Sequence, residues 1–133
     1  MSDDGNNDRR ERGRELMRQV YGWDFEPRTA FERQTVDHLF GEVWAVGKLP
    51  VRDRRLILIG LTAGSGQENV TGLQLDAAVR MGELDADDLR DIVVFLAHYA
   101  GWSRAAKLNT EVENLIARLG ETERTDPEHP PLP

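Results

Sequence analysis

Helical periodicity is the feature that most constrains how this chain of 133 residues can fold. Apolar residues recur at intervals of three and four, whereas sustained apolar–polar alternation and Asn-Gly hairpin turns are absent. Pro50, Gly82 and the acidic start at Asp85 and Asp88 are typical helix boundaries. We therefore expect an all-α fold in a single six-helix domain. The predicted helices span residues 9–21, 29–45, 51–64, 68–82, 86–100 and 103–119.

The two ends of the chain have a different composition. Residues 1–8 (MSDDGNND) are polar without periodicity, and residues 121–133 (ETERTDPEHPPLP) are acidic and rich in proline. We expect both ends to be disordered, with the helical domain spanning residues 9–120. For PEHPPLP, a short polyproline II segment that binds a partner is the alternative.

Charge and composition exclude several classes of protein. The net charge of −7, from 24 acidic and 17 basic side chains, argues against nucleic-acid binding and leaves a DNA-binding regulator as a distant third hypothesis. The basic cluster RRERGR (9–14) is interleaved with acid and is interpreted as a solvated helix face. The chain has no cysteine, which excludes disulfides, thiolate nucleophiles and zinc–thiolate sites. No signal-peptide pattern or long apolar run is present, so we expect a soluble, cytoplasmic protein without membrane contact.

The segment LILIGL (56–61) has no polar face. A helix of this kind must be covered on all sides, either at the centre of the fold or at a subunit interface. Gly60 would cost about 1 kcal/mol relative to alanine in an exposed helix, so we expect a neighbouring helix to approach it closely.

Two polar residues lie on apolar helix faces. On the fourth helix, Gln74 falls within the stripe formed by Val70, Leu73, Ala77 and Met81. A buried amide must be hydrogen-bonded, so Gln74 either ties helices together or lines a pocket. On the fifth helix, His98 lies on a second apolar face and is either an interface histidine or a proton donor.

His38 and Glu42 are four residues apart and therefore neighbours on the second helix. A carboxylate beside an imidazole favours its protonated form and could prepare it as a general acid. The alternative is an exposed helix pair. Two such ligands are too few for most metal sites, so we expect no metal.

Several segments in order resemble the carboxymuconolactone decarboxylase family of the alkylhydroperoxidase D-like superfamily. They are FGEVW (40–44), GKLPVRDRRLILIG (47–60), QLDAAVRMGELDADDLRDIV (74–93) and HYAGWSRAA (98–106). The resemblance runs from about residue 9 to 119 and implies an all-helical fold, trimers or hexamers, and pockets near subunit contacts. The best-known members decarboxylate a carboxylated muconolactone in aromatic catabolism.

This chain keeps some of the family's pattern and departs from it elsewhere. The matching residues are Glu42, Trp44, Arg54, Tyr99, Gly101 and Trp102. The decarboxylases have histidine at the positions of Gln74 and Phe95, arginine at that of Val46, and proline at that of Ser103. The peroxidase branch depends on a CxxC pair, which a chain without cysteine cannot form.

The first hypothesis from these residues is a decarboxylase, lyase or isomerase without a cofactor, acting on a small cyclic carboxylated or enolisable molecule. Glu42 and His38 would transfer protons, His98 could be a relocated acid, and Gln74 would donate to a developing oxyanion. The expected substrate-binding residues are Arg54, for a carboxylate, and Trp44, Phe95, Tyr99 and Trp102 as pocket walls. The second hypothesis is a non-catalytic small-molecule-binding or scaffold homo-oligomer.

Overall fold

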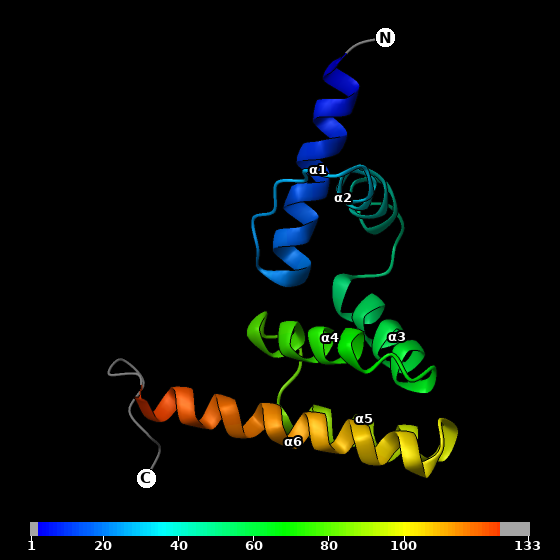
Figure 1. The fold of residues 1–133 in the computed structure, drawn as a ribbon, viewed down its shortest axis with the longest axis vertical. Coiled ribbons are helices and arrows are strands. Elements are labelled where there is room, and N and C mark those ends of the chain that lie inside the picture. Colours follow the sequence, from blue (N-terminus) through cyan, green and yellow to red (C-terminus); the bar gives the residue numbers. More distant parts are fainter. Residues whose placement is uncertain (1–2, 126–133) are drawn as a thin grey trace. The chain divides into compact units, whose positions relative to one another are not determined.

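The computed structural model describes residues 3–125, and every regular element among them is a helix (Figure 1). The elements are α1 (Asp3–Tyr21), α2 (Ala30–Gln34), the π-helix η1 (Thr35–Trp44), α3 (Val51–Gly64), α4 (Glu68–Arg80), α5 (Ala86–Tyr99) and α6 (Trp102–Thr125). α2 continues directly into η1, and together they correspond to the helix predicted at residues 29–45. The all-α prediction is confirmed.

Local sequence accounts for most helix ends. Thr29 caps α2 by accepting a hydrogen bond from the backbone of Glu32, whose side chain accepts from the backbone of Thr29. Asp85 and Asp88 form the same capping box at the start of α5, where the sequence predicted an acidic helix start. Gly82 has φ +72° directly after the C-cap of α4, a conformation that favours glycine.

The first and last helices are longer than predicted. α1 begins at Asp3, so most of residues 1–8 are helical rather than disordered. α6 continues to Thr125, past the predicted end at residue 119. Residues 5–8 are exposed, so this turn of α1 buries no apolar face and leaves no periodic signal in the sequence. The rest of the predicted tail, residues 126–133, lies outside the described residues.

The chain divides into two compact units, with the boundary between Leu56 and Ile57 within α3. In the first unit, α1 packs against η1 around a core of Met17, Val20, Val36 and Phe40. The two helices approach so closely that a Cβ on Gly13 would lie 1.9 Å from the carbonyl oxygen of Val36. Glycine is required at this contact because any side chain would collide with backbone.

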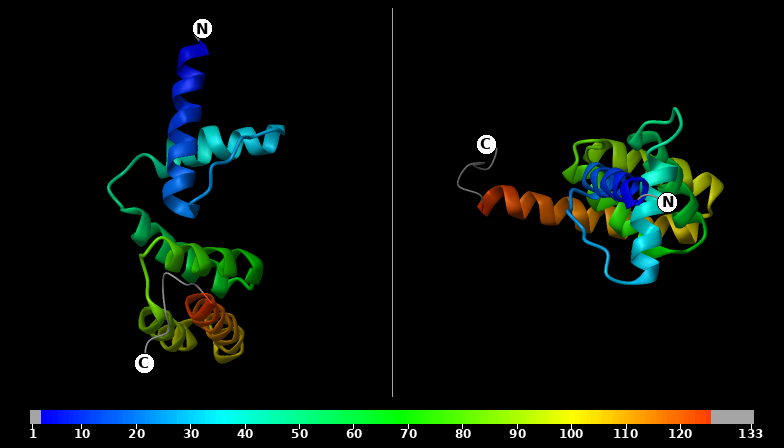
Figure 2. Two further views of the ribbon diagram at one scale, coloured as in Figure 1. Left: turned by 90° about the vertical axis from the view of Figure 1, so that its left-hand side faces the viewer. Right: turned by 90° about the horizontal axis from the view of Figure 1, so that it is seen from above.

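In the second unit, α5 and α6 pack side by side, and α4 also contacts α6 (Figure 1, Figure 2). The buried apolar residues of these helices are Leu75, Ala77, Ala78, Leu89, Val93, Ala97, Ala105, Leu108, Val112 and Leu115. The stripe predicted for α4 is partly wrong, because Val70 and Met81 are exposed and Thr71 is buried instead. The buried face is rotated toward Thr71, whose hydroxyl is hydrogen-bonded to that of Thr62 on α3 at 2.8 Å.

The apolar segment of α3 is not covered on all sides by its own chain. Ile59 is buried, but Ile57 and Leu61 are 57% and 60% exposed. No described atom of the same chain outside the local helix backbone lies within 4 Å of a Cβ placed on Gly60, so the helix expected to approach Gly60 is not one of the described helices of this chain. The two expectations for this segment, a central position and a subunit interface, both stay predictions. Among the described helices, none combines the length and apolarity needed to cross a bilayer.

Candidate functional site

η1 places His38 and Glu42 next to each other in the first unit. The Nδ1 atom of His38 lies 3.2 Å from Oε1 of Glu42, and Arg9 Nη1 on α1 donates to the same oxygen at 3.0 Å. The hydrogen bonds from His38 and then Arg9 lower the pKa of Glu42, which keeps this carboxyl ionised at neutral pH. A carboxylate accepts, so His38 donates through Nδ1–H. This leaves Nε2 as the atom through which the exposed imidazole can exchange a proton.

His38 lies at an open hollow of about 370 Å³ that is rich in arginine. The hollow lies along α1, α2 and η1, and we call it the cationic hollow. It is lined by Asn6, Arg9, Arg10, Ala30, Arg33, Gln34, Asp37 and His38. Arg9 and Arg10 belong to the basic cluster that the sequence analysis interpreted as a solvated face, and Arg33 was not singled out from the sequence.

Arg10 and Asp37 neutralise each other inside this hollow. Arg10 donates through Nε to Oδ1 at 2.6 Å and through Nη2 to Oδ2 at 2.8 Å, in a two-point contact with the carboxylate. The bond from Arg10 lowers the pKa of Asp37, which is only 8% exposed, and the same bond raises the pKa of Arg10. Arg9 is likewise paired with the ionised Glu42, so the positive charge left over in the hollow is that of Arg33.

Arg33 is the arginine best placed to meet a ligand. Its Nη1 donates to the carbonyl oxygen of Arg28 at 3.0 Å, and its remaining N–H groups have no hydrogen-bond partner within residues 3–125. The buried Nε of Arg9 also has no partner among the described residues, although both terminal nitrogens of Arg9 are bonded to Glu42 and Asn6. The hollow can therefore attract an anionic group or a developing negative charge.

Two other predicted site residues have structural contacts in the first unit. Arg54 donates through Nη1 to the carbonyl oxygen of Val43 at 2.7 Å and through Nη2 to that of Val46, which holds the end of η1. Trp44 stacks on Phe40 with ring centroids 5.7 Å apart and packs against the core. Their expected contacts with substrate stay predictions.

Gln74 lies on α4 in the second unit and is 1% exposed, so its predicted burial is confirmed. The amide is enclosed by protein in this structure. Its predicted role as an oxyanion donor stays a prediction.

The remaining predicted residues form a second group, at the end of α5 and the start of α6. Phe95, Tyr99 and Trp102 are 63%, 79% and 71% exposed, and with Val94 they form what we call the aromatic surface. His98 lies among them, and its ring centroid is 5.8 Å from that of Trp102 in an edge-to-face arrangement. Its Nδ1–H donates to the carbonyl oxygen of Val94 at 2.8 Å, which leaves Nε2 for exchange.

The structure thus brings His38 to Glu42, and His98 to Phe95, Tyr99 and Trp102. The sequence interpretation missed the cationic hollow, because the basic cluster at residues 9–14 was interpreted as a solvated face. That interpretation is wrong for Arg9 and Arg10, which pair with acids 33 and 27 residues away. No local pattern identifies such distant partners. Within residues 3–125, no three histidine or acidic side chains are grouped to hold a metal ion.

Comparison with known proteins identifies the family to which the chain belongs. The sequence model of the carboxymuconolactone decarboxylase family matches residues 29–113. The chain belongs to this family. Comparisons with curated proteins and with solved structures gave no significant match. The matched range includes both candidate histidines, whereas α1, which contributes Arg9 and Arg10 to the cationic hollow, precedes it.

Proposed function

We propose that this protein is a lyase or isomerase that uses no cofactor and acts on a small carboxylated or enolisable molecule bound in the cationic hollow. The observation that carries the proposal is His38, which is held through Nδ1 by an ionised Glu42 and lies at a hollow lined by arginines. An imidazole oriented in this way can transfer a proton through Nε2.

Decarboxylation would use the hollow as follows. The bond between the substrate carbon and its carboxylate breaks, carbon dioxide leaves, and the electron pair moves into a conjugated carbonyl to give an enolate. Positive charge from Arg33 stabilises the enolate oxygen. Nε2–H of the His38 imidazolium then protonates carbon. In an isomerisation, the neutral imidazole would instead remove a carbon-bound proton and return it at another carbon.

A second candidate function is a non-catalytic binding or scaffold protein. Gln74, which occupies a position where the decarboxylases have histidine, favours it, because an amide does not transfer protons at neutral pH. Gln74 is also 1% exposed. A chain that kept the helical fold and lost the chemistry could carry this replacement without a functional cost.

Exposed apolar residues support a homo-oligomer, a trimer or a hexamer, under either function. The aromatic surface and the exposed Ile57 and Leu61 of α3 belong to the second unit. Contiguous exposed apolar residues mark contact surfaces more often than solvated ones.

Turnover measurements on single variants test the proposal. The loss of 4-carboxymuconolactone is followed by ultraviolet absorbance, and product formation from related lactones and enolisable acids by mass spectrometry. We expect His38→Gln to lower kcat by about 10²- to 10⁴-fold, the usual contribution of a positioned acid or base. Arg33→Gln should lower kcat/KM, whereas Lys48→Gln, which removes an exposed cation elsewhere, should not.

The outcomes separate the alternatives. If His98→Gln abolishes turnover and His38→Gln does not, the aromatic surface rather than the cationic hollow holds the chemistry. A gain of decarboxylation only in Gln74→His would mean that the fold retains the family's site while the natural protein has another role. Binding without any product from any substrate favours the scaffold.

A further inference from the structure

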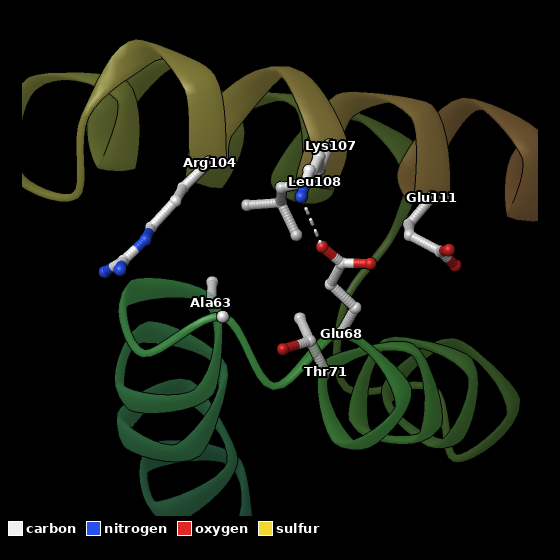
Figure 3. Close-up of a pocket in the computed structure, with 8 residues that line it drawn as sticks. Ala63, Glu68, Thr71, Arg104, Lys107, Leu108 and Glu111 are labelled. Carbon is white, nitrogen blue, oxygen red and sulfur yellow. Dashed lines mark ion pairs between the residues drawn. The ribbon is translucent and has the colours of Figure 1, made fainter.

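A second hollow, of about 210 Å³, lies in the second unit and takes no part in the proposed function (Figure 3). The C-terminal end of α3, the start of α4 and one face of α6 enclose it. Its charged lining residues are Glu68, Arg104, Lys107 and Glu111, and its apolar lining includes Ala63 and Leu108. We call it the α6 hollow.

The four charges are separated by sign along the α6 hollow. Arg104 lies at one end, Lys107 and Glu68 form an ion pair of 3.0 Å in the middle, and Glu111 lies at the other end (Figure 3). The cations therefore occupy one half and the anions the other. A ligand with a single sign of charge would be attracted by one half and repelled by the other, whereas a zwitterion satisfies both.

The two end charges are available to a ligand. Within the part of the chain that the structure describes, neither Arg104 nor Glu111 has a hydrogen-bond or ion-pair partner. The Glu111 carboxylate lies above Gly72 on α4, where a Cβ would be 3.4 Å from Oε2. A larger residue in place of Gly72 would narrow the anionic half.

The middle and the floor of the α6 hollow also suit a zwitterion. The side chains of Lys107 and Glu68 are 68% and 51% exposed, and an exposed pair of this kind is weak enough to exchange with ligand charges. Leu108 is buried and offers an apolar floor for methylene groups. Thr71 is also buried, and its hydroxyl is already hydrogen-bonded to Thr62.

We propose that the α6 hollow binds a linear zwitterion of the amino-acid class. Its carboxylate lies between Arg104 and Lys107, and its ammonium group beside Glu111. The midpoint of Arg104 and Lys107 lies about 8 Å along the helix axis from Glu111 at 1.5 Å per residue. An amino acid with five methylenes between its charged groups spans such a distance, and glycine does not.

Calorimetric titration of the full chain with 6-aminohexanoate tests this. We expect saturable binding with a Kd near 1 mM, and binding that is weaker by about tenfold or more for hexanoate, hexylamine and glycine, each of which loses a charged contact. Arg104→Gln and Glu111→Gln should each weaken 6-aminohexanoate binding by about the same factor. The exposed Lys48→Gln and Glu11→Gln are charge-matched controls that should bind as the natural chain does.

Several results would overturn the proposal. The first is a titration with 6-aminohexanoate that gives no saturable heat, and the second is an affinity for hexanoate equal to that for 6-aminohexanoate. The third is an unchanged affinity for 6-aminohexanoate in Arg104→Gln and Glu111→Gln, once circular dichroism has confirmed that both variants keep their helicity. The readout is binding rather than turnover, and the residues belong to the second unit. A loss of binding here is therefore distinguishable from failure of the proposed chemistry at His38.

Discussion

The ion pair between Arg10 and Asp37 should make a measurable contribution to the stability of the first unit, and Asp37→Asn is the direct test. Asp37 is 8% exposed and accepts two short hydrogen bonds from Arg10, which join α1 to η1. Asparagine keeps the shape of the side chain but removes the charge and turns one acceptor into a donor that faces the guanidinium.

The expected loss follows from these contacts. A hydrogen bond to a charged group contributes about 1.5–3 kcal/mol, and breaking a fully buried ion pair costs about 3–5 kcal/mol. The Arg10 side chain is 35% exposed, so water compensates for part of the loss. We expect Asp37→Asn to lower the free energy of unfolding by about 2 kcal/mol, which corresponds to a fall in Tm of roughly 6–10 °C for a domain of this size.

The dependence on pH gives a second readout. The pKa of Asp37 in the folded state lies below its ordinary value of 3.8. The ionised pair therefore stabilises the fold above pH 3.8, and this contribution is lost as the pH falls through the folded-state pKa. The difference in unfolding free energy between the natural chain and Asp37→Asn should thus be largest at neutral pH and shrink in acid.

Urea unfolding followed by circular dichroism at pH 7 and at several acidic pH values measures both effects. Asp24→Asn is the matched control, because Asp24 also pairs with arginines, Arg14 and Arg18, but its side chain is 60% exposed. Exposed pairs contribute about 0–1 kcal/mol. Our reasoning is refuted if the two variants lose equal stability at pH 7, or if the Asp37→Asn difference does not shrink in acid.

Three further predictions concern packing and assembly. Gly13→Ala should destabilise the chain by about 2–3 kcal/mol in urea unfolding, because its Cβ would collide with the Val36 carbonyl, whereas Gly5→Ala, with no described atom within 4 Å of its Cβ, should not destabilise it. Gln74→Ala removes a buried amide side chain and should cost about 2 kcal/mol in the same assay; an unchanged midpoint would show that the amide is dispensable to the core. Phe95→Glu, at a 63% exposed position, should lower the mass of the oligomer in sedimentation velocity and leave the helicity intact. An unchanged mass would show that the aromatic surface is not part of a subunit interface.

Helix positions were largely predictable, since caps and periodicity are local. α3 spans residues 51–64 as predicted, and Asp85 caps α5 through Asp88. The start of α1 was missed because an exposed helical turn needs no apolar stripe. The π-helical form of η1 was also missed, because apolar periodicity does not distinguish hydrogen bonding shifted by one residue from that of an α-helix.

The candidate site was predictable only in part. His38 and Glu42 meet because they are four residues apart, and the sequence alone determines this pairing within a helix. The arginines of the cationic hollow come from α1 and α2, and their positions beside His38 depend on how these helices pack.

The sequence by itself determined most of the helix boundaries, the acidic start of α5 and the family, since these follow from contacts within a few turns or from an ordered set of motifs. The tertiary structure decided that Arg10 neutralises Asp37, that Arg9 reaches Glu42, and that Arg54 holds the end of η1. The physical reason is that an arginine can reach many carboxylates and carbonyls. Which of them it meets is fixed only when packing brings distant parts of the chain together.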